Sequence, residues 1–281
     1  MMDNISPKDI EPRMYYRLLS GIIGPRPIAL VSSCNDAGMI NLAPFSFFNV
    51  MSIDPPILVF SPLRRLRKNT TKDTLNNVHQ VAEVVINIIG LNHVEQMSIA
   101  GNDYDASINE FEKSGFTSLK STTVQPPRVS EALASFECKV ISTLALGEKG
   151  GAGNLVLCEV LTSHFKKGII GEDFQINIEK LDLIARLGQD FYTKVNEGSL
   201  FRVKKESTEI AIGWDNLPLE IKESTFLTGN EISKLANVKS IPFDLKKMKI
   251  TSDPKTYRAV KKMLMENNIK KAWELLYFES T

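Results

Sequence analysis

The sequence contains few residues of the kinds that bind metals or form disulfides. Its three cysteines, Cys34, Cys138 and Cys158, stand far apart with no Cys-X-X-Cys pair, and its three histidines show no paired spacing. Zinc sites and disulfide frameworks depend on closely spaced ligands. The sequence therefore predicts no metal site. Cys138 and Cys158 stand inside apolar runs and are expected to be small core residues.

The chain also lacks a long apolar run and an excess of charge of one sign. The most apolar run, residues 81–91, is interrupted by Glu83 and Asn87 and falls short of the ~18 residues that a membrane helix needs. The first 16 residues carry charged side chains where a secretion signal would be apolar. A net charge of +1 gives no support for nucleic acid or an acidic membrane as a partner. We expect a cytoplasmic protein that binds neither.

Short β-branched segments dominate the first two-thirds of the 281 residues. Residues 27–33, 39–48, 57–61 and 83–89 are typical of strands, and residues 35–38 form a turn signal. Two longer segments, 134–146 and 154–165, predict a β-hairpin. Because no helices of 10–15 residues alternate with these strands, the pattern favours a mainly β antiparallel barrel over a doubly wound sheet.

Towards the C-terminus the sequence becomes helical in character. Residues 230–238 predict a short helix, and Asp253-Pro254 is typical of the start of another. Asn267-Asn268 predicts a break that divides this second segment into two helices. We therefore expect a barrel domain over residues 1–199 and a mostly helical extension over residues 200–281, which packs on the barrel or on a dimer.

A glycine-rich segment, residues 147–153 (GEKGGAG), could be taken for a dinucleotide-binding loop. That motif requires a helix directly after it, so that the helix N-terminus meets the pyrophosphate. Residues 155–161 read instead as a strand. The segment therefore predicts a flexible hairpin turn, which could still line the edge of a ligand site.

Residues 69–74 (NTTKDT) combine an amide, hydroxyl groups, an ammonium group and the backbone N–H groups of a predicted helix start. These are donors that a phosphate monoester needs, and the basic residues 64–68 add positive potential. A capped surface helix after a solvated basic loop explains the same residues, and taken alone the stretch favours that reading. Residues 41–49 likewise read, taken alone, as a core strand.

The order of the segments is more specific than any one of them. The series is made of residues 24–32 (GPRPIALVS), 41–49 (NLAPFSFFN), 54–56 (DPP), 57–61 (ILVFS), 69–74 (NTTKDT), 83–87 (EVVIN), 136–138 (FEC) and 186–188 (RLG). Over about residues 10–195 it resembles the flavin reductase-like family of FMN-binding split barrels, which includes flavoredoxin. Residues 212–218 and 227–231 resemble the C-terminal part of longer bacterial members. The resemblance implies a six-stranded Greek-key barrel that binds FMN non-covalently near the interface of a homodimer.

The resemblance also implies roles for individual residues. The isoalloxazine ring would be lined by Ser46, Phe47, Phe48 and Asn49. The ribityl chain and phosphate would be held by Ser61, Asn69, Thr71, Lys72, Asp73 and Thr74. Asp73 would repel a phosphate, so it is expected to fix Lys72 or a ribityl hydroxyl. Arg26 would approach the flavin or a nicotinamide phosphate, and Arg186 and Tyr192 would close the pocket.

The activity implied by the resemblance is flavin reduction by NADH or NADPH. Hydride would pass from the nicotinamide to flavin N5, a step that needs orientation but no catalytic acid or base from the protein. Two alternatives remain open: an electron-transfer protein that works with a protein partner, as the name flavoredoxin suggests, and a module that binds FMN without turnover. Split barrels also occur in pyridoxamine-phosphate oxidases and haem-handling proteins, so the fold does not decide between them.

Overall fold

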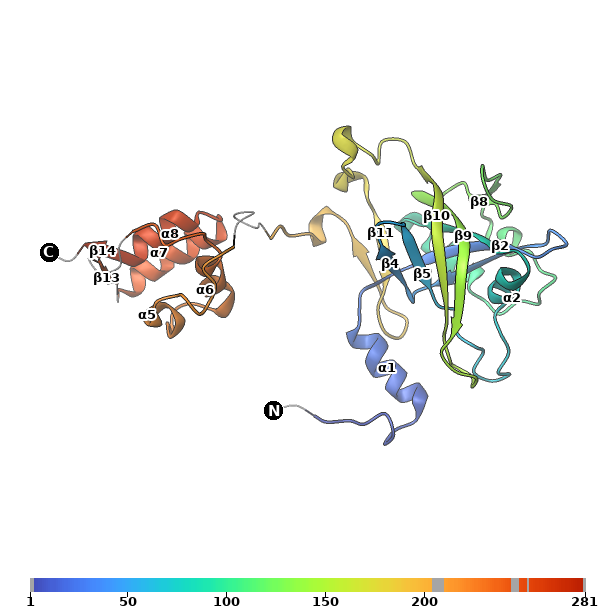
Figure 1. Ribbon diagram of the computed structural model, residues 1–281, viewed down its shortest axis with the longest axis horizontal. Coiled ribbons are helices and arrows are strands. Elements are labelled where there is room, and N and C mark those ends of the chain that lie inside the picture. Colours follow the sequence, from blue (N-terminus) through green and yellow to red (C-terminus); the bar gives the residue numbers. More distant parts are fainter. Residues whose placement is uncertain (1–2, 204–209, 244–247, 252, 280–281) are drawn as a thin grey trace. The chain divides into compact units, whose positions relative to one another are not determined.

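The computed structural model describes residues 3–203, 210–243, 248–251 and 253–279 (Figure 1). The chain forms two compact units, residues 1–200 and residues 201–281. Each unit has apolar clusters of its own, two in the first and one in the second. Among the described residues, no helix is both long enough and apolar enough to cross a membrane.

A seven-stranded antiparallel sheet forms the centre of the first unit, with the order β3-β2-β6-β9-β10-β5-β4. Its strands are β2 (Ala29–Cys34), β3 (Ile40–Phe45), β4 (Phe48–Ser52), β5 (Ile57–Phe60), β6 (Glu83–Ile88), β9 (Ala134–Ala145) and β10 (Asn154–Phe165). β3 and β4 lie at opposite ends of this order, yet only Ser46 and Phe47 separate them in the chain. The bent segment of β3 and β4 therefore brings the two edges of the sheet together. Counted as one strand, it gives the six-stranded barrel that was predicted.

The long hairpin of β9 and β10 agrees with its prediction. The two strands pair from Asn154 opposite Ala145 to Phe165 opposite Ala134, with two shifts of register on the way. Residues 146–153 connect them, so the glycine-rich segment is a turn, and Gly151 adopts a φ of +89° that favours glycine. Cys138 and Cys158 are fully buried in the barrel core, as predicted.

The helices of the first unit are α1 (Pro12–Ile22), α2 (Asp73–Gln80), α3 (Val94–Ala100) and α4 (Glu110–Ser114). α1 was not predicted from the sequence. α2 packs Leu75 and Val78 into the barrel core. Residues 69–71 were expected to cap this helix, but Asn69 adopts a left-handed φ of 49° and forms part of a turn before α2. Its N-cap is Lys72, which makes no side-chain capping hydrogen bond.

Smaller elements complete the first unit. A three-stranded sheet has the order β1-β11-β12, and a two-stranded sheet pairs β7 with β8. The strands are β1 (Arg26–Pro27), β7 (Ser118–Leu119), β8 (Arg128–Val129), β11 (Leu183–Arg186) and β12 (Tyr192–Val195). Short 3-10 turns span Leu91–His93, Glu172–Phe174, Ile178–Lys180 and Glu197–Ser199.

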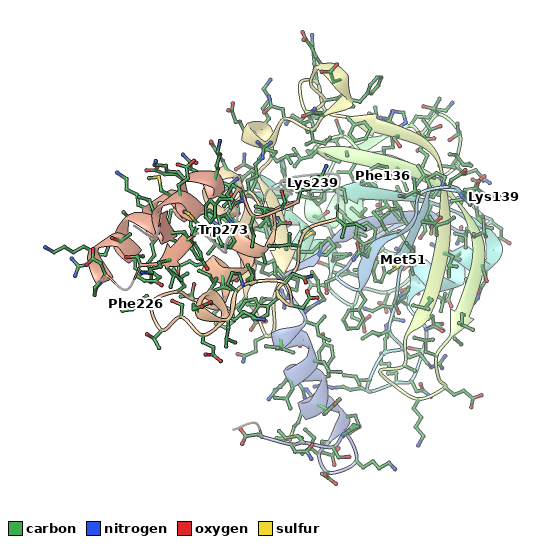
Figure 2. The ribbon with its side chains drawn as sticks, turned by 60° about the vertical axis from the view of Figure 1, so that its left-hand side comes forward. Met51, Phe136, Lys139, Phe226, Lys239 and Trp273 are labelled. Atoms are coloured by element: carbon green, nitrogen blue, oxygen red, sulfur yellow. The ribbon has the colours of Figure 1, made fainter. Side chains whose placement is uncertain are left out.

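The second unit packs short helices around Trp273, which is fully buried among them (Figure 2). Its elements are α5 (Leu219–Lys222), α6 (Gly229–Ala236), β13 (Met248–Ile250), α7 (Pro254–Met265), α8 (Ile269–Leu276) and β14 (Tyr277–Glu279). The predicted helix start is confirmed, because Asp253 accepts hydrogen bonds from the N–H groups of Lys255 and Thr256, each at 3.1 Å. The predicted division into two helices before Ile269 is confirmed as well.

Candidate functional site

The stretch 69–74 forms a loop that Arg65 holds in shape. The Arg65 N–H donates to the carbonyl of Thr70 at 2.8 Å, and the Asn69 N–H donates back to the Arg65 carbonyl at 2.9 Å. The guanidinium then donates through Nη1 to the carbonyl of Thr71 and through Nη2 to Asp73 Oδ2, the latter at 2.8 Å. The loop therefore curls around one half-buried cation and ends at the first residue of α2.

The third nitrogen of the Arg65 guanidinium binds a carboxylate from elsewhere in the chain. Nε donates to Asp103 Oδ1 at 2.5 Å, and Lys72 Nζ lies 3.7 Å from the same oxygen. The hydrogen bond and the positive charge of Arg65 lower the pKa of Asp103. Burial works against the charged form of Arg65, but its bonds to Asp103 and Asp73 raise the pKa of the guanidinium. Asp73 was expected to fix Lys72 or a ribityl hydroxyl; the structure pairs it with Arg65 instead.

Five consecutive backbone N–H groups, from Thr70 to Thr74, donate to no acceptor within the part of the chain that the structure describes. They stand at the start of α2, where the helix dipole favours an anion. Lys72 adds an ammonium group at the same place, and its side chain is 32% exposed. These donors fit a phosphate monoester, which needs several directional hydrogen bonds and a compensating cation.

The polar side chains of the stretch are mostly engaged with the protein itself. Asn69 Oδ1 accepts from Arg64 Nε at 2.8 Å, and Thr71 Oγ1 donates to Asn76 Oδ1 at 2.6 Å. Thr74 is buried, and its Oγ1 accepts from Asn41 Nδ2 at 3.0 Å. The backbone N–H groups, rather than these side chains, therefore present the free donors of the loop, and the Lys72 ammonium group beside them is paired with Asp103.

Ser61 stands between the loop and the bend at residues 46–47. Its N–H donates to the carbonyl of Phe47 at 2.9 Å. A Cβ at position 153 would lie 2.7 Å from Ser61 Oγ, so only glycine fits beside this hydroxyl. The glycine-rich turn also exchanges backbone hydrogen bonds with Arg64 through Gly151 and Ala152, each at 2.9 Å. The turn thus lies beside the stretch that leads to residue 69.

The four residues expected at the isoalloxazine ring point in different directions. Phe48 packs against the barrel core. Phe47 lies edge-on to Tyr16 of α1, with ring centroids 6.2 Å apart. Asn49 is exposed, and Ser46 is half-buried at the bend. Of the four residues, Ser46 and Asn49 therefore carry the polar side chains that lie outside the core.

A small cavity of about 40 Å³ connects the end of β3 with the start of α2. Pro44 and Phe45, which directly precede Ser46, line it together with Lys72, Asp73 and Thr74. Glu110 also lines it; burial raises the pKa of this carboxyl, although its Oε2 accepts from the N–H of Leu42 at 3.0 Å. The bend at residues 46–47 and the loop at 69–74, which are distant in the sequence, are therefore neighbours.

Arg26 lies beside Phe47 at the bend, with its guanidinium 5.9 Å from the ring centroid, whereas Tyr192 lies beside Arg186. The Arg26 guanidinium is buried and donates to the carbonyls of Ser20, Ile23 and Leu187 at 2.7, 2.6 and 3.2 Å. The Tyr192 ring lies 4.4 Å from the Arg186 guanidinium, in a cavity of about 490 Å³ between α3 and the β11–β12 pair. Among the described residues, neither Arg26 nor Tyr192 contacts the stretch 69–74.

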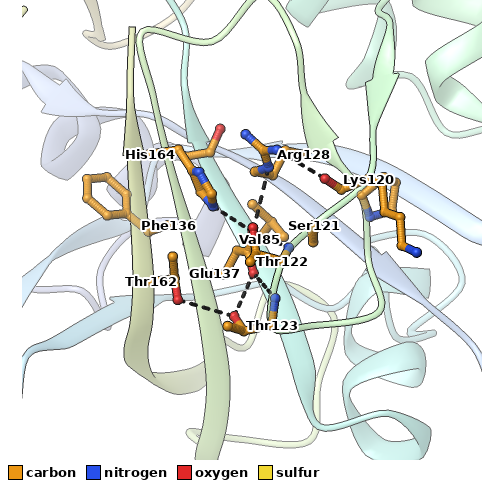
Figure 3. A network of polar contacts seen from close by, with 12 residues as sticks. Val85, Lys120, Ser121, Thr122, Thr123, Arg128, Phe136, Glu137, Thr162 and His164 are labelled. Carbon is orange, nitrogen blue, oxygen red and sulfur yellow. Dashed lines mark hydrogen bonds and ion pairs between the residues drawn. The ribbon is translucent and has the colours of Figure 1, made fainter.

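A buried carboxylate network lies on the β9–β10 hairpin (Figure 3). Glu137 is fully buried and accepts hydrogen bonds from the N–H groups of Thr122 and Thr123, at 2.8 and 2.6 Å, and from the Thr123 hydroxyl. His164 Nε2 lies 2.7 Å from its Oε1, and Arg128 Nε lies 3.6 Å from the same atom. Burial raises the pKa of Glu137, but these hydrogen bonds outweigh burial and hold it at about 2. The network fastens residues 120–128 to the hairpin.

Two residues of the candidate site had no role in the sequence-based prediction. Arg65 was noted only as a source of positive potential, because the sequence does not show which carbonyl groups it binds. Asp103 lies between two short helices and 30 residues after Asp73, so no local pattern connects it with Lys72. Within the described residues, no group of three or more His, Cys, Asp or Glu side chains is arranged to hold a metal ion.

Residues 24–175 match the model of the flavin reductase like domain. An uncharacterized protein of Aquifex aeolicus is 37% identical over 187 residues, which make up 66% of this chain and 93% of that protein. The match to the domain model ends before the second unit begins.

Two solved structures resemble the first unit closely. Nitrilotriacetate monooxygenase component B from Bacillus cereus superposes with a TM-score of 0.67 at 30% identity, over 72% of this chain and 99% of that chain. The 2-nitrobenzoate 2-nitroreductase NbaA from Pseudomonas fluorescens gives 0.65 at 29% identity, over 74% and 99%. These similarities confirm the predicted split-barrel fold. Together with the matched domain, they show that the chain belongs to the flavin reductase like family.

Proposed function

We propose that the first unit binds FMN and that the protein is an NAD(P)H-dependent flavin reductase. The observation that carries the proposal is the series of free N–H groups from Thr70 to Thr74, next to the Lys72 ammonium group, in a member of the flavin reductase like family. The similar structures support a redox role, since one is named as a monooxygenase component and the other as a nitroreductase.

In this proposal the N–H groups and Lys72 bind the phosphate, and Asp73 is kept away from it by its bond to Arg65. Ser61 and the exposed amide of Asn49 hold the ribityl chain and the polar edge of the ring. Bound FMN would supply the site that accepts hydride and passes electrons on. The protein then contributes orientation and a dry face, the latter from the aromatic residues beside the bend.

The proposal includes a homodimer in the cytoplasm, where NADH and NADPH are the available donors. Val50, Met51 and Ile53, on and just after β4, are all more than 60% exposed, and Figure 2 shows the position of Met51. Such apolar side chains on one strand and its turn suit an interface with a second copy. Light scattering should give twice the chain mass of 31.4 kDa. A mass of one chain at micromolar concentration would remove the dimer from the proposal.

Anaerobic stopped-flow spectroscopy tests the activity. The FMN-loaded protein is mixed with NADH or NADPH, and the flavin absorbance near 450 nm is followed. We expect bleaching much faster than that of free FMN under the same conditions. If neither nucleotide bleaches the loaded protein faster than free FMN, the protein is not a nicotinamide-dependent reductase, and FMN binding is then judged by titration alone.

The Lys72→Ala variant tests the phosphate site. It removes a charge-assisted contact of about 1.5–3 kcal/mol, so FMN affinity should fall by roughly 10- to 150-fold. Riboflavin affinity should change little, because riboflavin has no phosphate. Lys68→Ala, four residues away and exposed, is the matched control and should have a much smaller effect. An equal loss for FMN and riboflavin would show that Lys72 does not recognise the phosphate.

A further inference from the structure

Residues 102–108, which connect α3 to α4, have few attachments to the rest of the molecule. None of the N–H groups of residues 103–107 donates a hydrogen bond to any part of the chain that the structure describes. The Asn102 side chain binds Tyr104 within the segment, and the Ile108 N–H closes a local turn on Asp105. Asp103 makes the polar contacts that join the segment to another part of the chain, to Arg65 and Lys72. Among the described residues, Asp103 is therefore the polar attachment of the segment, next to the half-buried side chains of Tyr104 and Ile108.

That carboxylate occupies a position suited to an anionic oxygen. A single atom, Asp103 Oδ1, lies 2.5 Å from Arg65 Nε and 3.7 Å from Lys72 Nζ. With Asp103 in place, Arg65 and Lys72 are balanced by Asp73 and Asp103, and the group has no net charge. A phosphate dianion gains little from a neutral group, but without Asp103 the group carries one positive charge.

The two carboxylates differ in how firmly they are held. Asp73 is the first residue of α2, whose Leu75 and Val78 are anchored in the barrel core. Asp103 is 54% exposed and stands on the loosely attached segment, so it can move into water at small cost. An incoming anion would therefore replace Asp103 rather than Asp73.

We propose that Asp103 competes with the phosphate of FMN for Arg65 Nε and Lys72, so that it sets the affinity and exchange rate of FMN and releases residues 102–108 when FMN binds. The inference rests on the proposed function. It makes Asp103 a specificity-determining residue, because riboflavin, which lacks the phosphate, does not displace it. A protein with such a competitor exchanges FMN more readily than one with a permanently open phosphate site.

The Asp103→Asn variant tests the competition directly. Asparagine keeps an oxygen that can accept from Arg65 Nε but carries no charge, so the fold is preserved. We expect FMN to bind on the order of tenfold more tightly and to dissociate more slowly, with riboflavin affinity unchanged. Asp103→Glu retains the charge and should resemble the wild-type protein. Asp105→Asn, in the same segment, is the matched control and should change neither affinity.

Limited proteolysis gives a second measurement that does not depend on activity. Chymotrypsin cleavage after Tyr104 should become faster when FMN is added to the full-length protein and should not change with riboflavin. Protection of this bond by FMN would overturn the release of the segment. Unchanged or weaker FMN binding in Asp103→Asn would overturn the competition.

The outcomes separate this inference from the proposed function. If the wild-type protein binds FMN no better than riboflavin, the phosphate site itself is wrong and the inference fails with it. If the wild-type protein prefers FMN and Asp103→Asn leaves that preference unchanged, the proposed function stands and only the competition is overturned.

Discussion

The two units of this chain bury different kinds of side chain. The buried polar and charged residues of the described structure, among them Arg26, Asn87, Glu110 and Glu137, all lie in the first unit. The described part of the second unit buries apolar side chains and the phenols of Tyr257 and Tyr277. Within the described residues the Tyr277 hydroxyl has no hydrogen-bond partner, and burial raises its pKa to about 12. Burying polar groups is costly unless each is satisfied, so the first unit uses them where segments must be held in place.

The two units also differ in the side chains that make their polar contacts. Asn87 Oδ1 accepts from the N–H of Val129 at 3.0 Å, and Asn87 Nδ2 donates to the carbonyl of Leu30 at 3.0 Å. In the second unit, helix caps join residues only two or three positions apart, such as Thr228 with Glu231. The barrel thus joins distant segments through buried polar side chains. The second unit combines local caps with one apolar cluster, to which Trp273 and Lys234 add long-range bonds to the carbonyls of Leu235 and Leu264.

The largest effect is expected from Trp273→Ala, which tests whether the two cores are independent. Removing this fully buried ring should destabilise the second unit by about 4 kcal/mol, because it leaves a cavity and frees the carbonyl of Leu235. The chain has two tryptophans, Trp214 and Trp273, so the fluorescence of Trp214 still reports on the second unit in the variant. Urea unfolding followed by fluorescence should shift to lower urea.

The same variant should leave the barrel unaffected, because the cluster around Trp273 contains no residue of the first unit. FMN affinity and the urea midpoint of the β-sheet circular dichroism signal are the measurements. Trp273→Phe is the control and should cost less, since it keeps a ring. Equal shifts of both unfolding signals would show that the two units unfold together and would break the comparison.

Glu137→Gln is expected to have the next largest effect. It leaves His164 and Arg128 without a carboxylate in a buried network, and breaking such a network should cost about 3 kcal/mol of the unfolding free energy. Glu131→Gln is the matched control. Glu131 also accepts a backbone N–H, from Thr117, but at an exposed position, so its replacement should cost well under about 1 kcal/mol.

The pH dependence of unfolding sharpens this test. The pKa of Glu137 is held at about 2, below the ordinary 4.5, so its stabilisation is complete above pH 4.5 and is lost as the pH falls towards 2. The unfolding free energy of the wild-type protein should therefore decrease between these pH values. Glu137→Gln should show a smaller decrease. Parallel curves for the two proteins would show that Glu137 is not the group that titrates.

These contacts also explain what the sequence could predict. The hairpin of β9 and β10, the glycine-rich turn and the two helices after Asp253 follow from periodicity and turn or cap residues within a few positions. The helix α1 was missed, and it places several apolar residues in exposed positions, such as Ile22 at 82%. The apolar residues of α1 nevertheless have a helical spacing as clear as that of α6 and α7, so the helix was missed in the interpretation and not for lack of a pattern.

The candidate site shows more clearly what the sequence could not predict. The donors at residues 69–74 could be proposed as a phosphate site because they are residue types that stand together in the sequence. The partners of Asp73 and Lys72 could not be predicted. Arg65 reaches Asp73 only when the loop is folded, and Asp103, the partner of Lys72, belongs to a distant segment. The helix cap expected from residues 69–71 also lies too early in the chain, since Arg64 and Arg65 hold Asn69 in a turn and the helix begins at Asp73.

The smallest effect is expected from Thr228→Ala, which tests the local character of the second unit. Thr228 caps α6 through a bond from the Glu231 N–H, and Glu231 Oε2 accepts from the Thr228 N–H at 2.7 Å. Loss of the cap should cost about 1 kcal/mol, because the N–H of Glu231 then loses its acceptor in the protein. Tryptophan fluorescence in urea measures it. Ser233→Ala, exposed on the same helix, should have almost no effect. If Thr228→Ala lowered the unfolding free energy as much as Trp273→Ala does, α6 would depend on its cap as much as on the apolar cluster. The second unit would then not owe its stability mainly to that cluster.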